Sequence, residues 1–268
     1  MKTSLPIGVE QMLNKVPEVT LYFWIIKIMA TTVGETAADF LNINLHFGLT
    51  GTSIVMSAIL IAFLFMQIRA KKYIPWLYWL AVVLISVVGT LITDNLVDNF
   101  GVSLEATTIA FSIALLATFA VWFASEKTLS IHSIFTLKRE LFYWAAILFT
   151  FALGTVAGDL VAEGVSLGYA NSTLVFGALI GVVAIAYYGF RLNAVLAFWI
   201  AYILTRPLGA SFGDYLSQPL ANGGLGLGAT ATSILFLATI LGLVTYLTFI
   251  RQNVTDNVAD DTICTHLP

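Results

Sequence analysis

Charged side chains are scarce in this sequence. Only 10% of its 268 residues are Asp, Glu, Lys or Arg, whereas 59% are hydrophobic, and the mean hydropathy is +0.92. Soluble domains carry about 25% charged residues, so a folded chain of this composition needs lipid as its solvent. The net charge is −3 and the basic residues form no cluster, which argues against a nucleic-acid partner.

Cysteine and histidine are also nearly absent. The one cysteine, Cys264, lies in a polar tail, which excludes a disulfide framework and a thiolate metal site. His46, His132 and His266 lie outside the apolar runs, so paired haem ligands are missing. The sequence has no HExxH, GxSxG or P-loop motif. We therefore expect no enzyme and no organic cofactor, and an intramembrane aspartyl pair that shares a proton is the enzymatic alternative.

Apolar runs of about 20 residues, the length that crosses a bilayer as a helix, occur eight times. The predicted spans are 19–41, 49–68, 77–98, 103–125, 142–163, 166–190, 196–217 and 226–250. Residues 1–18 are then a cytoplasmic N-terminal segment, 19–250 a transmembrane domain, and 251–268 a disordered cytoplasmic tail.

The basic residues predict the orientation of these spans. Ten of the twelve Lys and Arg residues precede the first span, follow an even-numbered span or lie in the tail. The four connections that follow odd-numbered spans contain no Lys or Arg. The positive-inside rule then places both termini in the cytoplasm.

An internal repeat is the most informative pattern. Four copies each contain a Trp, a Gly ten residues later and an Asp fifteen residues later. These are Trp24, Trp79, Trp144 and Trp199; Gly34, Gly89, Gly154 and Gly209; and Asp39, Asp94, Asp159 and Asp214. The copies cover about 19–70, 74–126, 139–190 and 194–250. Because each copy starts and ends on the cytoplasmic side, the repeats are parallel. We expect an all-α integral membrane fold of four tandem helical hairpins, arranged about a pseudo-fourfold axis or as two halves.

The tryptophans and glycines have structural interpretations. A Trp near the cytoplasmic start of each odd span predicts an interface anchor. The glycines begin small-xxx-small steps, which predict close helix packing. A local helix break that exposes carbonyl groups is the alternative, and it is strongest beside Pro207.

The repeated aspartates are the candidate site. An ionised carboxylate at membrane depth costs at least ~2.5–3.5 kcal/mol. Glu35, Asp98 and Glu163 each lie four residues from a repeated Asp and share its helix face. Such neighbouring carboxylates need a proton, a base or a cation, so we predict ion or proton binding by all seven acids.

Hydroxyl pairs begin the second helix of each copy and are expected to support this site. They are Thr52 and Ser53, Thr107 and Thr108, Ser172 and Thr173, and Thr232 and Ser233. The alternative is that the aspartates only cap helices and bond these hydroxyls. Lys27 and Arg206 fall within spans and are expected to be charge partners of the acids, although Lys27 can also snorkel to the interface. Oxygen-only ligands favour a hard metal cation such as Mg, Ca or Mn.

The fourfold pattern resembles a bacterial family of uncharacterised membrane-anchored proteins built of four tandem two-helix repeats. The resemblance covers about residues 15–252 and implies eight helices in a bacterial inner membrane, but it implies no activity. From the residues we predict a transporter or channel for a small cation, either a hard divalent metal or a proton-coupled solute. A structural or partner-binding membrane protein is the alternative.

Overall fold

The protein is all helical in the computed structural model, which describes residues 14–41 and 48–264, with side chains described up to residue 250. The first thirteen residues of the predicted N-terminal segment and the last four of the predicted tail lie outside these ranges. The long helices are α2 (Leu21–Asp39), α3 (Gly48–Arg69), α4 (Pro75–Asp94), α5 (Leu104–Glu126), α6 (Leu137–Asp159), α7 (Tyr169–Phe190), α8 (Ala194–Ser217) and α9 (Ala229–Cys264).

Local sequence signals set where several helices begin. The side chains of Thr20, Ser103, Thr136 and Asn193 accept hydrogen bonds from backbone N–H groups in the first turns of α2, α5, α6 and α8. Such N-caps satisfy donors that the helix leaves free. α4 instead begins with Pro75, whose missing N–H costs nothing at that position.

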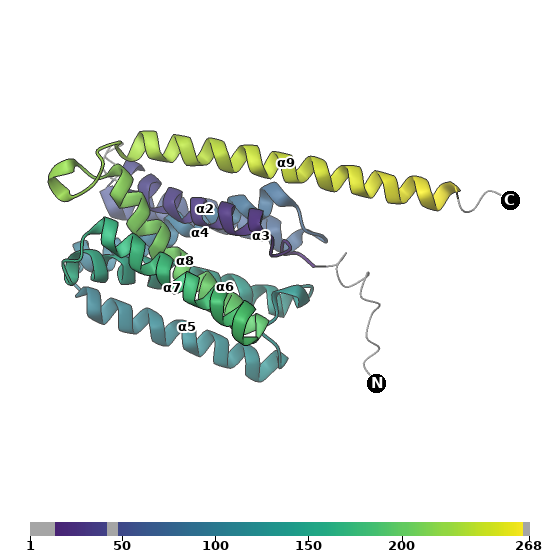
Figure 1. The fold of residues 1–268 in the computed structure, drawn as a ribbon, viewed down its shortest axis with the longest axis horizontal. Helices are drawn as coiled ribbons and strands as arrows, with labels where there is room; N and C mark the ends of the chain where they lie inside the picture. Colours follow the sequence, from purple (N-terminus) through teal and green to yellow (C-terminus); the bar gives the residue numbers. More distant parts are fainter. Residues whose placement is uncertain (1–13, 42–47, 265–268) are drawn as a thin grey trace.

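The first and second helices of the copies form an inner and an outer set. More than half of the apolar stretch of α4, α6 and α8 is buried, against fewer than a fifth in α3, α5, α7 and α9. The inner helices pack in cyclic order: α2 on α4, α4 on α6, α6 on α8, and α8 on α2. Figure 1 shows the helices running side by side, with α2 beginning and α9 ending at the right of the view.

Each outer helix packs mainly on the inner helix of the next copy. α3 lies on α4, α5 on α6 and α7 on α8, while α9 returns to α2. Successive copies are therefore held together by both of their helices, and the last copy contacts the first.

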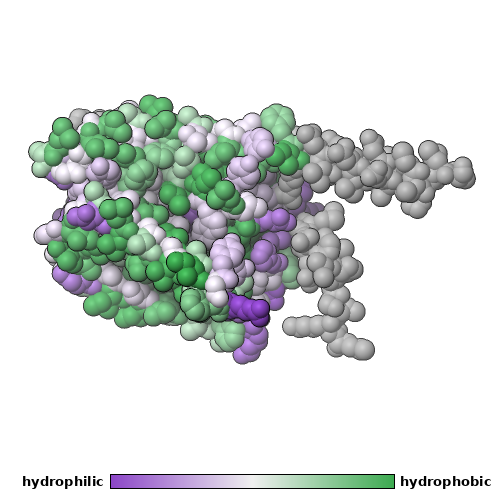
Figure 2. All heavy atoms as spheres, in the orientation of Figure 1, coloured by the Kyte–Doolittle hydropathy of each residue, from purple (hydrophilic) through white to green (hydrophobic). Residues whose placement is uncertain are grey.

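Seven of the described helices are long and apolar enough to cross a membrane. α2 is not among them, because Lys27, Glu35 and several threonines lower its hydropathy. It is nevertheless enclosed by α4, α8 and α9. Apolar side chains cover much of the side of the bundle in Figure 2, and hydrophilic ones gather toward its right-hand end. The chain is thus a multi-pass membrane protein by its structure as well as its composition.

The C-terminal tail differs from the prediction. Residues 251–264 continue α9 as helix, where the sequence predicted disorder from 251. This stretch contains neither Gly nor Pro, so nothing in it ends the helix.

Candidate functional site

All seven predicted acids line one cavity at the C-terminal ends of the inner helices. This acidic cavity has a volume of about 250 Å³. Its lining consists of Glu35, Asp39, Thr93, Asp94, Val97, Asp98, Leu104, Val156, Asp159, Glu163, Asp214 and Gln218. No basic residue lines it in the described part of the chain. The cavity therefore concentrates negative charge contributed by all four inner helices.

Burial changes with depth along the cavity wall. Glu35 and Asp214 are buried, at 7% exposure each, whereas Asp39, Asp94 and Asp159 are half-buried. Asp98 and Glu163 are exposed and lie one turn beyond the repeated aspartates. The cavity thus has its mouth at the end of the bundle opposite the start of α2, and Glu35 at its inner end.

The backbone changes conformation directly after three of the four aspartates. A π-helical turn follows Asp94 at Asn95–Asn99, and another follows Asp159 at Leu160–Gly164. Residues 40 and 41, after Asp39, are also π-helical. π-turns in helices occur frequently at functional sites. Copy four differs, since α8 ends at Ser217 and Gln218 is extended.

The hydroxyl pairs do not bond the aspartates in the described structure. Thr107, Thr108, Thr173 and Thr232 donate to backbone carbonyls four residues earlier. Ser53 likewise donates to Leu49 O and accepts from Asn95, while Ser233 donates to Thr36. The buried hydroxyls of Thr52 and Ser172 have no partner among these residues. The aspartates are therefore not capped by these hydroxyls.

The acids share a cavity without forming a close ligand shell. Over the residues that the structure describes, no three His, Cys, Asp or Glu side chains are grouped so as to hold a metal ion. The cavity of about 250 Å³ is polar and far larger than the space that one water needs, so it can hold several waters. In this conformation its geometry suits a hydrated cation better than a stripped metal ion.

A fully buried arginine closes the inner end of the cavity. The guanidinium of Arg206 donates to Glu35 Oε2 at 3.1 Å, to Thr90 Oγ1 at 2.5 Å and to Thr155 Oγ1 at 2.6 Å. It also donates to the backbone oxygen of Thr31 at 3.2 Å. This Arg206 layer (Arg206, Glu35, Thr90 and Thr155) joins all four inner helices through one side chain.

Sequence reasoning missed the two threonines of this layer. Thr90 and Thr155 each lie eleven residues after the repeat Trp, which is the position that Glu35 occupies in copy one. Comparing the residue at this position in the four copies would have identified both threonines. Sequence reasoning also placed Arg206 among the charge partners, and the structure gives it Glu35 as partner.

The structure places Lys27 deep in the bundle, one layer further toward the start of the inner helices. Its side chain is fully buried, so it does not snorkel to the interface. Its Nζ donates to Thr205 Oγ1 at 3.3 Å and lies 4.3 Å from the ring centroids of both Phe151 and Tyr202.

The four repeat tryptophans pack between copies instead of facing lipid. Trp79, Trp144 and Trp199 are at most 5% exposed, and Trp24 is half-buried. Each packs on the aromatic residue that precedes the Trp of the previous copy, with ring centroids 5.5–6.2 Å apart. The pairs are Phe23 with Trp79, Tyr78 with Trp144, Tyr143 with Trp199, and Phe198 with Trp24. An anchor role was expected because Trp favours the interface, but these positions are covered by neighbouring helices.

The same aromatic residues close the bundle at the end opposite the cavity. Phe23, Tyr78, Tyr143 and Phe198 form an aromatic layer in which every side chain is buried. The hydroxyls of Tyr78 and Tyr143 are hydrogen-bonded at 2.5 Å. Together with the Arg206 layer, this packing separates the acidic cavity from the other end of the bundle.

The repeat glycines lie at close approaches between inner helices. A Cβ at Gly34 would overlap Ser86, one at Gly154 would overlap Arg206, and one at Gly209 would overlap Thr31. A Cβ at Gly89 would lie 3.0 Å from Phe151, which is a tight contact without overlap. In every case the neighbour lies seven residues after the Trp of the next copy, with copy four meeting copy one.

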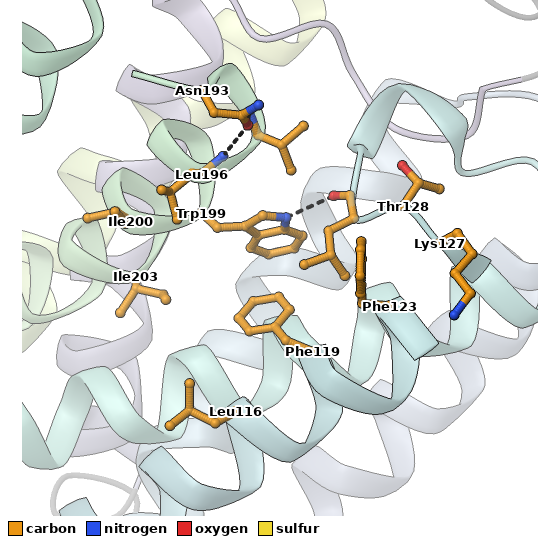
Figure 3. A pocket seen from close by; sticks show the side chains of 12 residues that line it. Leu116, Phe119, Phe123, Lys127, Thr128, Asn193, Leu196, Trp199, Ile200 and Ile203 are labelled. Atoms are coloured by element: carbon orange, nitrogen blue, oxygen red, sulfur yellow. Dashed lines mark hydrogen bonds between the residues drawn. The ribbon is translucent and has the colours of Figure 1, made fainter. Parts of the chain in front are cut away.

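A second, larger cavity of about 560 Å³ lies between α5 and α8 and contains none of the repeated acids. Figure 3 shows Leu116, Phe119, Leu196 and Ile203 around it, with Lys127 at one side. Trp199 Nε1 donates to Leu129 O at its wall. Its lining is mainly apolar and belongs partly to lipid-facing α5, so it offers little to bind an ion.

The fold and the cavity define a multi-pass helical membrane protein built of tandem repeats. The chain belongs to the family described as Repeat of Unknown Function (DUF347), whose profile matches residues 22–73, 77–128, 142–193 and 197–253. No curated protein and no solved structure matches the chain.

Proposed function

We propose that the protein is a transporter for a small cation, which binds in the acidic cavity. The observation that carries this proposal is the single cavity lined by seven carboxylates and no base within the described residues. Held together without counter-charge, such carboxylates attract cations or protons. The proposal covers hydrated divalent metal ions and proton-coupled solutes.

The finer architecture is part of the same proposal. We place eight helices across a bacterial inner membrane with both termini cytoplasmic, and α2 is the least apolar span. Four parallel helix pairs surround a pseudo-fourfold axis. The cyclic contacts of the helices, the tryptophans and the glycines support this arrangement. In this orientation the mouth of the cavity faces away from the cytoplasm.

The closed inner end favours a carrier over an open channel. A cation that leaves the cavity along the axis meets Arg206 first and Lys27 next, both positively charged groups at 0% exposure. The aromatic layer then blocks the remaining path. Passage therefore requires the inner helices to rearrange, as in alternating access.

The test is cation flux into proteoliposomes, with Mn²⁺ and Mg²⁺ as probes and a trapped indicator dye. We expect Asp39→Asn, Asp94→Asn, Asp159→Asn and Asp214→Asn each to weaken cation binding by about tenfold or more. An interaction with a charged group is worth about 1.5–3 kcal/mol, and 1.4 kcal/mol is a factor of ten.

Glu105→Gln is the matched control. Glu105 lies near the same end of the bundle but is exposed and does not line the cavity. Its loss should leave flux unchanged. Equal flux in the wild type and all four aspartate variants, each verified as folded by size-exclusion chromatography, would refute the proposal.

A structural role is the second candidate, and the Arg206 layer favours it for Glu35 and Arg206. One buried guanidinium that bonds three other helices holds the bundle together whether or not an ion passes. This function predicts that changes to the aspartates lower folding yield more than flux per folded molecule.

A further inference from the structure

Lys27 is a buried amine without an acidic partner. Its side chain is 0% exposed, and its one hydrogen-bond acceptor among the described residues is Thr205 Oγ1 at 3.3 Å. The remaining contacts of Nζ are the faces of Phe151 and Tyr202. Arg206, by contrast, has Glu35 at 3.1 Å.

The groups that surround Lys27 do not neutralise its charge. From α8 it meets Tyr202, Thr205 and the positive charge of Arg206, and from α6 it meets Phe151. Of the two acids on its own helix, Glu35 is paired with Arg206 and Asp39 lines the acidic cavity more than three turns away. An ammonium so placed holds its proton weakly, so added positive charge beside it is enough to drive the proton off.

Buried polar groups lie on both sides of this amine along the bundle. Toward the cavity, the hydroxyl of Thr31 donates to the carbonyl of Thr205, and Arg206 donates to the carbonyl of Thr31. Toward the other end, the next buried hydroxyls are that of Tyr202 and those of the hydrogen-bonded pair Tyr78 and Tyr143.

Several buried polar atoms in the same zone lack partners. The Tyr202 hydroxyl, Ser86 Oγ, Thr150 Oγ1 and Arg206 Nε have none among the described residues.

We propose that Lys27 is a proton-binding site whose occupancy competes with cation binding in the acidic cavity, which makes the protein a cation–proton antiporter. This inference rests on the proposed transport function. A cation beside Glu35 weakens its pairing with Arg206 and leaves Arg206 as an uncompensated charge next to Lys27. The Lys27 ammonium then becomes a neutral amine, and its proton passes to bulk water when the inner helices rearrange for transport. By linkage, protonation of Lys27 opposes cation binding to the same extent.

The test measures protons released when Mn²⁺ or Mg²⁺ binds to the purified full-length protein in weakly buffered detergent solution. Cavity carboxylates also exchange protons for cations, so the informative quantity is the difference between variants. We expect Lys27→Met to bind the cation while releasing about one proton fewer than the wild type. The slope of log Kd against pH should be smaller by about one, because about one proton fewer is exchanged for each cation bound.

Lys27→Arg separates charge from protonation, because a guanidinium keeps its proton. Like Lys27→Met, it should release about one proton fewer than the wild type when the cation binds. It should also bind the cation more weakly than the wild type. Lys138→Met is the control, since Lys138 is an exposed lysine paired with Glu126 at the other end of the bundle. It should behave as the wild type.

The two proposals fail in different ways. Unchanged proton release in folded Lys27→Met and Lys27→Arg overturns the role of Lys27 while cation binding persists. A wild type that neither binds nor transports the probe cations overturns the transport function, and the antiport inference with it.

Discussion

Removing the charge of Glu35 tests the central ion pair most directly. Glu35 Oε2 accepts from Arg206 at 3.1 Å and from Thr90 at 3.3 Å, and Glu35 is the acid that Arg206 contacts. Glu35→Gln leaves the guanidinium in the core with hydroxyl and carbonyl acceptors only. Breaking a buried pair on one side costs about 3–5 kcal/mol, and we expect the free energy of unfolding to fall by the lower part of that range because Thr90 and Thr155 remain.

The double variant Glu35→Gln/Arg206→Gln provides the decisive comparison. With both charges gone, no uncompensated ion remains in the core, so the double variant should be more stable than Glu35→Gln alone. The corresponding coupling energy is about 0.5–3 kcal/mol for groups in contact. Asp98→Asn is the control, since Asp98 is an exposed acid of the same cavity and should change stability by less than about 0.5 kcal/mol.

Reversible unfolding in mixed micelles, followed by circular dichroism, measures these differences. The reasoning fails if Glu35→Gln costs less than about 1 kcal/mol, which is below the cost of an orphaned buried charge. It fails equally if the losses in the two single variants simply add in the double variant.

Two further changes test the packing between copies. Gly154→Ala should cost about 1–3 kcal/mol of unfolding free energy because the new Cβ overlaps Arg206, whereas Gly181→Ala, with open space around it, should be neutral or slightly stabilising in the same thermal unfolding assay. Tyr78→Phe removes one hydroxyl of the bonded tyrosine pair and should cost about 0.5–1.5 kcal/mol by the same measurement, and a gain in stability would show that the pair is not favourable.

Much of the candidate site was predictable from the repeat. Four aspartates at one spacing from a tryptophan, with three further acids one turn away, placed seven carboxylates on corresponding helix faces. Identical position in each copy implies a common depth, and the structure brings all seven to one cavity. The apolar runs also predicted the all-helical fold. A segment that crosses a membrane must hydrogen-bond its own backbone N–H and C=O groups, and a helix does this.

Other features depended on packing that a local pattern does not encode. The tryptophans were assigned to the interface from residue preference. Each inner helix is covered by two neighbours and an outer helix, so three of these rings are buried and that of Trp24 is half-buried. The short connection between the two helices of a copy allows the outer helix to pack either on the inner helix of its own copy or on that of the next copy. The sequence therefore did not predict which of the two it contacts. Arg206 was recognised as buried and paired, yet its contacts with Thr90 and Thr155 required the positions of three other helices.

The return of α9 to α2 has a consequence for biogenesis. In the proposed arrangement α2 enters the membrane first, carrying Lys27 and Glu35. Two of the helices that shield these groups, α8 and α9, begin only at Ala194 and Ala229, more than 170 residues after α2 begins at Leu21. Until then, the nascent chain exposes unpaired charge to lipid or to the insertion machinery. A product truncated before α8 would never bury that charge, and it would be a natural target for membrane quality control.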